Sequence, residues 1–408
     1  MSRMTRAATG LTTGLTTGLA TLALALAPGA ASAGAAEPAV TVKAGGALQL
    51  TGHGFGHGRG MSQYGAEGAA RRGLTSTQIL AFYYPGTTIA KIGGKISVRI
   101  GADTSADTVV AASSRLVARV VGRPTQKWAL ASLQPSATRW RLKPVSATRT
   151  ALAYQAPGRR WARVTVLDGT GEFFAGGAPI TLVLPSGTAT YRGALRNAPT
   201  AAGGKDRDTV NVLALQSYVR GVVAREMPSS WSAAALQAQA VAARTYAAYD
   251  RAHAPGGRHY QTCDSTSCQV YGGVAAETPA TDAAVAATNG QILTYAGQPA
   301  FTQFGSSSGG WTVRGSVPYQ AAKADPYDAW AGNHVHDWTA SVPAASIQAA
   351  WPEIGTLTAV QVVGRDGNGD WGGRVSALRL TGTKKTVTVP GTDFRTLLGL
   401  RSTYFRLG

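Results

Sequence analysis

The 408-residue chain has few acidic residues, few cysteines and no long apolar run, and each shortage excludes a class of protein. It has 20 Asp and Glu against 39 Lys and Arg, so its formal net charge is +19 and an anionic partner is expected. Two cysteines are too few for a disulfide-dense scaffold, and no internal apolar run reaches the roughly 20 residues of a membrane span. With 44% hydrophobic and only 14% charged residues, the chain is not of the disordered class.

The first 33 residues have the pattern of an export signal. Arg3 and Arg6 precede a short apolar stretch over residues 19–28, and Ala31-Ser32-Ala33 is a small-x-small cleavage pattern. We therefore expect a protein that is secreted or held at the cell wall, with no stable membrane span after cleavage. Removing the two arginines from +19 leaves +17, which suits an anionic cell-wall polymer. The positive charge would also suit a nucleic acid, but an exported protein meets the cell wall instead, so we expect no nucleic-acid partner.

Between this signal and the C-terminus, helical and β-rich patterns alternate. Residues 76–84 are predicted to be a helix capped by Thr75 or Ser76, and an alanine-rich stretch over 232–251 is predicted to be a long helix. We predict an α+β fold in which a helical core around residues 210–250 packs with β-rich modules. The expected segments are an export signal (1–33), a Gly- and His-rich segment with one helix (34–94), a β-rich module (95–205), a core segment (206–345) and a C-terminal β segment completing the core (346–408).

One carboxylate lies where a helix over residues 214–225 is predicted to end. Glu226 stands among mostly apolar neighbours and just before Pro228. Desolvation would raise its pKa, and a neutral carboxylic acid can protonate an ether oxygen. The alternative is a solvated Glu that caps the following helix.

The long alanine-rich helix contains no acid up to Tyr249, so its polar residues are conspicuous. Gln239 could reach a neutral ligand oxygen and Arg244 an anionic one, because the guanidinium fork suits a carboxylate. The alternative for Arg244 is a buried structural pair with a core carboxylate.

Two glycine-rich segments are either ligand-lining loops or structural turns. Residues 52–66 hold five glycines before Met61 and two histidines four residues apart. Two histidines alone are too few ligands to indicate a metal site. Residues 306–310 are a serine and glycine run after a predicted strand. Neither segment is a phosphate loop or a serine-hydrolase elbow.

The two cysteines are five residues apart, at Cys263 and Cys268. In an exported protein a local disulfide is the default. The rival is a zinc site that adds His259, which has suitable spacing but no obvious fourth ligand. We expect the disulfide, and no cofactor.

Several of these segments together resemble the SpoIID/LytB family, the stage II sporulation protein D and amidase-enhancer group. The resemblance runs from about residue 52 to the C-terminus and is weakest over 100–190. The matching segments are the Gly-Met-Ser-Gln-Tyr-Gly box (60–66), Tyr-Val-Arg-Gly-Val-Val (218–223), Glu-Met-Pro (226–228), the alanine-rich Ala-Arg-Thr-Tyr helix (235–246), and residues 268–273, 277–279 and 306–310.

The resemblance implies a lytic transglycosylase that cleaves peptidoglycan glycan strands, with the Glu of the Glu-Met-Pro motif, Glu226, as the single catalytic acid and base. The muramyl C6 hydroxyl would replace water and leave 1,6-anhydro ends. The alternative is a non-catalytic amidase enhancer or wall-binding protein, with a cell-wall amidase as partner. The residues expected to contact substrate are Arg244, Gln239, Tyr246, Ser306, Ser307, Ser308, Lys323, His57, Gln63 and Tyr64.

The chain departs from the family pattern in two ways. The Gly-Met-Ser-Gln-Tyr-Gly box usually lies near the C-terminus of these proteins but here precedes the other motifs, which is tolerable if the termini meet in space. Some members bind zinc through His and Cys near the positions of Cys263 and Cys268. Here Ser267 stands beside Cys268 where a His would help, which favours the disulfide.

Overall fold

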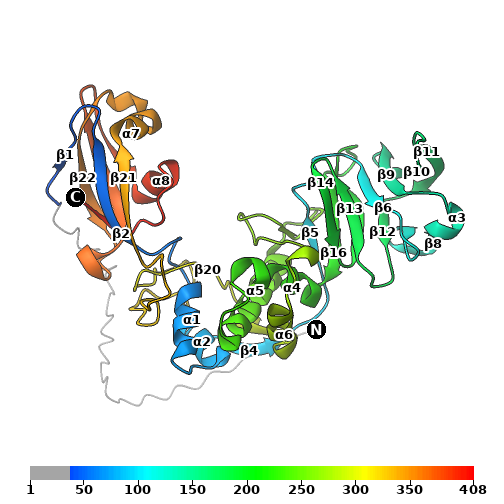
Figure 1. The fold of residues 1–408 in the computed structure, drawn as a ribbon, viewed down its shortest axis with the longest axis horizontal. Coiled ribbons are helices and arrows are strands. Elements are labelled where there is room, and N and C mark those ends of the chain that lie inside the picture. The colour runs from blue at the N-terminus through cyan, green and yellow to red at the C-terminus, as the bar shows by residue number, and fades with distance from the viewer. Residues whose placement is uncertain (1–36) are drawn as a thin grey trace, which may run out of the picture. The chain divides into compact units, whose positions relative to one another are not determined.

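The computed structural model describes residues 37–408 (Figure 1). Within this range, buried apolar side chains form three separate clusters. The predicted export signal at residues 1–33 lies outside the described residues. The mixture of helices and sheets confirms the α+β fold class. Within residues 37–408, none of the helices combines the length and the apolar character needed to cross a membrane.

The β-rich module consists of two sheets that share one core around Trp140, Phe173 and Leu195. One sheet has the strand order β11 (Ala162–Asp168), β10 (Arg149–Gln155), β9 (Arg139–Ser146), β6 (Thr108–Ala111), β13 (Ile180–Leu184) and β14 (Gly187–Tyr191). The other has the order β17 (Thr262–Cys263), β5 (Lys95–Arg99), β16 (Arg207–Ala214), β15 (Ala194–Pro199), β12 (Gly171–Phe174), β7 (Val117–Val120) and β8 (Arg123–Ala129). Strand β16 runs directly into the helical core, so this module sets the position of the helix that ends at Glu226.

The helical core is built on α5 (Ala233–His253), which packs against the other four helices of this region. Alanine on several faces of α5 lets neighbouring helices approach closely, because a methyl side chain keeps backbones near one another. In α4, Gly221 allows close contact with the Tyr271 ring, because a Cβ at this position would collide with that ring. The neighbours are α1 (Gln63–Arg71), α2 (Ser76–Tyr83), α4 (Leu215–Glu226) and α6 (Pro279–Ala287). The small sheet β19 (Gln298–Pro299), β18 (Gln291–Tyr295) and β4 (Thr88–Lys91) lies beside α5.

Residues 346–408 do not complete the helical core but form their own core with N-terminal strands, which corrects the expected role of that segment. One sheet contains β1 (Val40–Thr41), β22 (Leu357–Arg365), β23 (Val375–Gly382) and β24 (Thr386–Pro390); the other contains β21 (Asp337–Pro343), β2 (Ala47–His53) and β25 (Phe405–Leu407). Helices α7 (Ala344–Ala350) and α8 (Gly391–Leu397) cover this core. The apolar residues of the segment alternate as strands, of which β22 pairs with β1 and β25 pairs with β2.

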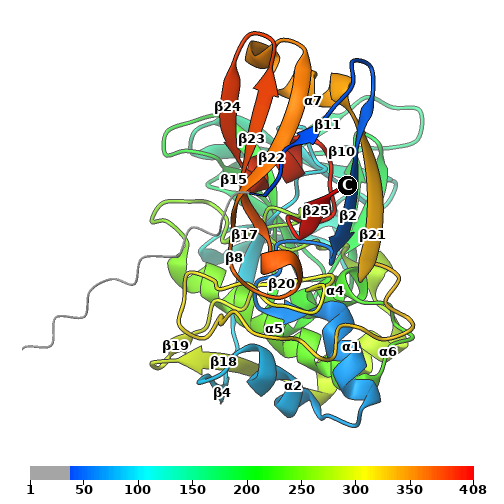
Figure 2. The same ribbon diagram turned by 90° about the vertical axis from the view of Figure 1, so that its left-hand side faces the viewer.

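The two ends of the described chain meet in one sheet. Strand β2 lies between β21 and the last strand β25 (Figure 2). In this pairing Leu50 lies opposite Leu407. From β2 the chain passes through the glycine-rich loop to β3 (Met61–Ser62), which pairs in parallel with β20 (Phe304–Gly305). The box that comes early in the sequence therefore lies beside residues 304–310. This closure is the spatial condition that a permuted arrangement requires.

The predicted element limits agree with the structure over the regular segments. Helix α2 begins after the N-cap Thr75, whose side chain and that of Gln78 form a capping box. The strand predicted before the serine run is limited to the two residues of β20, and beyond it Ser307 makes a single backbone bridge with Phe55.

Candidate active site

Glu226 is the last residue of α4, and the local sequence explains why the helix stops there. Met227 is the C-cap in an extended conformation, and Pro228 cannot continue a helix because it has no backbone N–H. The Glu226 side chain is half-buried and lines a cavity of about 310 Å³. The predicted acid is therefore at a helix terminus beside space for a ligand.

The Gly-Met-Ser-Gln-Tyr-Gly box supplies a hydrogen bond to the Glu226 carboxyl group. The Gln63 side-chain amide donates from Nε2 to Glu226 Oε2 over 3.1 Å. Gln63 is the first residue of α1, and the preceding residue, Ser62, is its N-cap, accepting a hydrogen bond from Gly65 N. Because the cap fixes where α1 begins, it also fixes the direction in which the Gln63 side chain points. The box thus positions the carboxyl group although 163 residues separate the two partners in sequence.

Burial raises the pKa of Glu226 above its ordinary value. Three smaller influences act in the opposite direction: the Gln63 hydrogen bond, a hydrogen bond with the Val270 backbone, and the positive charge of Arg225. Desolvation disfavours the charged form, whereas hydrogen bonds to the carboxylate favour it. The net upward shift increases the fraction of Glu226 that carries a proton, as an acid catalyst needs.

His57 and Tyr246 also line the cavity, so the structure brings both predicted contacts to Glu226. His57 Nδ1 accepts a hydrogen bond from Arg59 N over 2.9 Å, which leaves Nε2 as the protonated donor nitrogen. Desolvation, followed by the charges of Arg59, Arg374 and Arg395, lowers the pKa of His57. The remaining lining residues are Thr266, Ser267, Cys268, Gln269, Val270, Gln303 and Phe304.

Arg244 and Gln239 lie away from the cavity, in the core of the molecule. Arg244 is 1% exposed and donates to Gln216 Oε1 and to the carbonyl oxygens of Gln291 and Val285. Burial lowers the pKa of its guanidinium to about 10. Gln239 is fully buried, and both polar atoms of its amide lack a hydrogen-bond partner among the described residues. The structure thus gives Arg244 the buried structural position, bound to carbonyls instead of the expected carboxylate.

The serine run at residues 306–308 binds two buried aspartates that sequence reasoning missed. Ser307 Oγ donates to Asp328 Oδ2 over 2.6 Å, and Ser308 Oγ donates to Asp325 Oδ2 over 2.8 Å. Ser62 of the box also donates to Asp328. The carbonyl of Ser306 accepts from the backbone N–H of Tyr64. These serines therefore hold loops together and do not line the cavity; scattered acids after residue 320 gave no motif that could have revealed their partners.

Lys323 and Tyr64, two further predicted substrate contacts, do not line the Glu226 cavity. The Lys323 ammonium donates to the Phe82 carbonyl and lies 3.6 Å from the centroid of the Phe82 ring. Tyr64 packs edge-on against Trp231, with ring centroids 4.9 Å apart, and its hydroxyl lies 3.2 Å from His334 Nδ1. Trp231 N donates to the Pro228 carbonyl, so Trp231 lies one turn after the Glu-Met-Pro motif. The pair of Tyr64 and Trp231 is therefore close in the chain to Glu226.

Cys263 and Cys268 form a disulfide. His259 Nε2 lies 2.7 Å from Asp208 Oδ2, and both cysteine sulfurs are bonded to each other, so the structure offers no thiolate for zinc at this place. Cys268 and Ser267 instead contribute to the cavity wall beside Glu226. The disulfide thus closes a loop that forms part of the wall of the cavity.

Comparison with known proteins agrees with these motifs. Residues 204–295 match the sequence model of the SpoIID family, described as stage II sporulation protein. The chain is 33% identical over 221 residues to stage II sporulation protein D of Bacillus subtilis (strain 168), and 32% identical over 224 residues to the protein of the same name from Bacillus amyloliquefaciens. Each match covers 48% of this chain and 61% of the relative.

A third relative, the amidase enhancer of Bacillus subtilis (strain 168), is 40% identical over 116 residues, which are 27% of this chain and 15% of that protein. The chain thus spans about three fifths or less of the length of these relatives. The matched region carries α4 with Glu226, α5 and the disulfide loop. Through this region the chain is similar to the SpoIID/LytB family.

Proposed function

We propose that this protein is a secreted lytic transglycosylase that cleaves the MurNAc–GlcNAc bonds of peptidoglycan with Glu226 as its single acid and base. The observation that carries the proposal is the half-buried Glu226 carboxyl, which has a raised pKa, opens to a cavity and accepts a hydrogen bond from Gln63. The names of the relatives, stage II sporulation protein D and amidase enhancer, support a role in the cell wall.

The cavity suits chemistry that needs one carboxyl group. Glu226 is the only carboxylate among the described residues that line it. Ordinary glycosidases use two carboxyl groups, about 5–5.5 Å apart in retaining and about 6.5–9.5 Å in inverting enzymes. Glu226 would give its proton to the glycosidic oxygen as that C–O bond breaks. The resulting carboxylate would take the proton of the muramyl C6 hydroxyl as its oxygen attacks C1, which closes a 1,6-anhydro ring and restores the acid.

The other cavity groups have matching roles in this proposal. The Nε2–H of His57 and the Tyr246 hydroxyl are donors that would bind sugar hydroxyls or the N-acetyl group. Gln63 and the Val270 backbone would hold the carboxyl in one orientation beside the cavity. The charge of +17 that remains without the two signal arginines would concentrate the protein on an anionic wall, more weakly as salt screens it.

A non-catalytic role is the second candidate, because one relative is named an amidase enhancer. In that case the protein would bind the wall and stimulate a cell-wall amidase. Protonation of Glu226 would then not be needed for its activity. The two candidates differ in whether glycan ends change when the protein acts alone.

The experiment that separates them compares Glu226→Gln with the wild-type protein on purified glycan strands and on intact sacculi. Release of 1,6-anhydro products, measured by mass spectrometry, is expected to fall about 10²–10⁴-fold in the variant. The matched control is Glu353→Gln, an exposed glutamate in the C-terminal unit, which should retain wild-type release. Equal release from Glu226→Gln and wild type would contradict the acid role. Stimulation of an added amidase, without any release by the wild type alone, would favour the enhancer role.

A further inference from the structure

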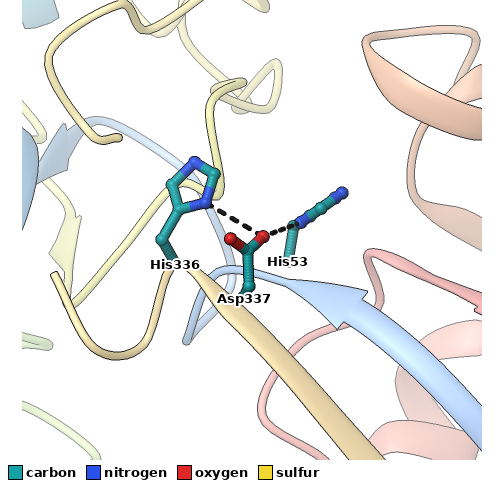
Figure 3. Close-up of side chains that lie close together, drawn as sticks. All are labelled: His53, His336 and Asp337. Atoms are coloured by element: carbon teal, nitrogen blue, oxygen red, sulfur yellow. Dashed lines mark hydrogen bonds and ion pairs between the residues drawn. The ribbon is translucent and has the colours of Figure 1, made fainter. Parts of the chain in front are cut away.

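A second chemical group lies at the ends of β2 and β21, apart from the residues of the Glu226 cavity. His53 is the last residue of β2, Asp337 is the first residue of β21, and His336 precedes it. Figure 3 shows the Asp337 carboxylate between the two imidazoles. Asp337 Oδ1 lies 2.6 Å from His53 Nδ1 and 3.1 Å from His336 Nδ1. One carboxylate oxygen and two imidazole nitrogens therefore converge on one point.

The far nitrogen of each imidazole faces another carboxylate. His53 Nε2 lies 3.5 Å from Asp370 Oδ2, and His336 Nε2 lies 4.0 Å from Asp328 Oδ2. Both Nε2 atoms are buried and lack a hydrogen-bond partner among the described residues. If each Nδ1 carries the proton that Asp337 accepts, each Nε2 presents a lone pair toward a carboxylate. Neutral imidazoles thus leave these two nitrogens unsatisfied.

A metal ion removes this conflict. The Nδ1 lone pairs would bind the ion, and each Nε2 would carry a proton that points at its outer carboxylate. A histidine that binds zinc usually donates its other N–H in this way, which fixes the tautomer and the ring. We infer that His53, His336 and Asp337 form a site for a divalent cation of the zinc class, with Asp370 and Asp328 as outer carboxylates.

The geometry fits this cation with little movement. The three ligand atoms lie within 4.8 Å of one another. Ligand atoms about 2.0–2.1 Å from a tetrahedral ion are about 3.3 Å apart, so the contact of 3.1 Å needs to open by about 0.2 Å and that of 2.6 Å by about 0.7 Å. Two imidazoles and one carboxylate leave a fourth position for water.

The surroundings hold the rings in place and leave a route for the ion. The Trp371 ring stacks on His53 at 4.3 Å between centroids, and the Tyr404 ring meets it edge-on at 5.2 Å. The side chains of His53 and His336 are 14% and 18% exposed, whereas that of Asp337 is 72% exposed. The ion can therefore enter along the Asp337 side and find two oriented nitrogens.

The site joins two chain segments that lead to the catalytic region. After His53 the chain enters the loop that carries His57 to the cavity, and before His336 it leaves the loop that contains Asp328. Gly54 N already donates to the His336 carbonyl over 2.7 Å. A bound cation would hold these two segments together at the base of the His57 loop. This inference does not depend on the proposed reaction, because it concerns binding of an ion alone.

The test is a titration of tag-free, metal-stripped protein with Co²⁺, followed by displacement with Zn²⁺. We expect one Co²⁺ per chain, visible as absorption in the visible range from a site of low coordination number, and loss of that absorption with Zn²⁺. His336→Gln and Asp337→Asn should each weaken binding roughly 100-fold or more, and Asp370→Asn about 10–100-fold. Because the Asp337 side chain is 72% exposed, Asp337→Asn replaces a ligand oxygen at the surface with a side chain of the same shape.

Two other histidines serve as matched controls. His253→Gln changes an exposed residue at the end of α5, and His259→Gln changes the residue near the disulfide; both variants should bind one Co²⁺ as the wild type does. The inference is overturned if the wild-type protein binds no more Co²⁺ than Asp337→Asn, or if His259→Gln loses binding while His336→Gln keeps it.

Discussion

Glu226 and the pair Asp325 and Asp328 are both removed from water, yet they differ in what surrounds the carboxyl groups. Burial raises the pKa of Glu226, and burial together with the nearby charge of Asp328 raises the pKa of Asp325 to about 6. Glu226 receives one side-chain hydrogen bond and borders a cavity. Asp328 is fully buried and accepts from Ser62, Ser307 and two backbone N–H groups.

The comparison shows that a raised pKa alone does not make a catalytic acid. Desolvation acts on both sites in the same direction. At Asp325 and Asp328, however, the neighbouring serines and Tyr83 bind the carboxylate oxygens in the core, whereas the Glu226 carboxyl borders a cavity. Two adjacent box residues divide these tasks, since Ser62 binds Asp328 and Gln63 binds Glu226. The box thus joins a structural site to a candidate active site.

Asp328→Ala is expected to have the largest effect on stability. The substitution leaves the hydroxyls of Ser62 and Ser307 and two backbone N–H groups without their acceptor, which should lower the free energy of unfolding by about 3–5 kcal/mol. Urea denaturation measures the loss. Asp168→Ala is the control, because the exposed pair of Asp168 with Arg123 should contribute about 1 kcal/mol or less. Equal losses in the two variants would show that the buried network does not stabilise the fold.

Asp325→Asn should change how stability depends on pH. A carboxyl group whose folded-state pKa is raised binds more protons in the folded than in the unfolded chain, so its effect on stability is lost as pH rises. With a folded pKa of about 6 against an ordinary 3.8, the wild-type protein should lose up to about 3 kcal/mol between about pH 4 and 6 relative to the variant. Parallel unfolding curves over this range for both proteins would contradict a proton held by Asp325.

Gln63→Ala should have the smallest of the three effects, and it should change the pH dependence of activity at the Glu226 site. Loss of the hydrogen bond that favours the carboxylate should raise the pKa of Glu226 further. Because the protonated form is the acid, activity should persist to a pH higher by on the order of half to one unit, while the maximal rate falls about 10-fold because the carboxyl is less well oriented. The measurement is the pH profile of anhydro-product release.

The matched control for this change is Gln49→Ala, an exposed glutamine on β2 whose side chain donates to Ser341. Its pH profile should coincide with that of the wild type. A shift of the Gln63→Ala profile toward lower pH would mean that Gln63 does not act on the Glu226 carboxylate.

Regular elements and the family motifs were accessible from the sequence. Periodicity and a capping pattern predicted α2 and α5 within a few residues, and the Glu-Met-Pro motif led to the acid at the end of α4. The prediction for Arg244 as a substrate contact is not supported by its position, since an arginine on an alanine-rich helix has the same local sequence whether it faces a cavity or a core. The serines at 306–308 were ambiguous for the same reason, because their partners are distant in the chain.

The sequence by itself determined the positive charge, the helices, the family motifs and the place of Glu226 at a helix end, because these depend on composition and on residues near one another in the chain. Only the tertiary structure decided that β2 closes against β25, that Gln63 reaches Glu226, and that His53 meets His336 and Asp337. These contacts join residues more than 150 positions apart. Local propensity cannot specify such pairs, since they arise when separate strands and loops pack into one arrangement.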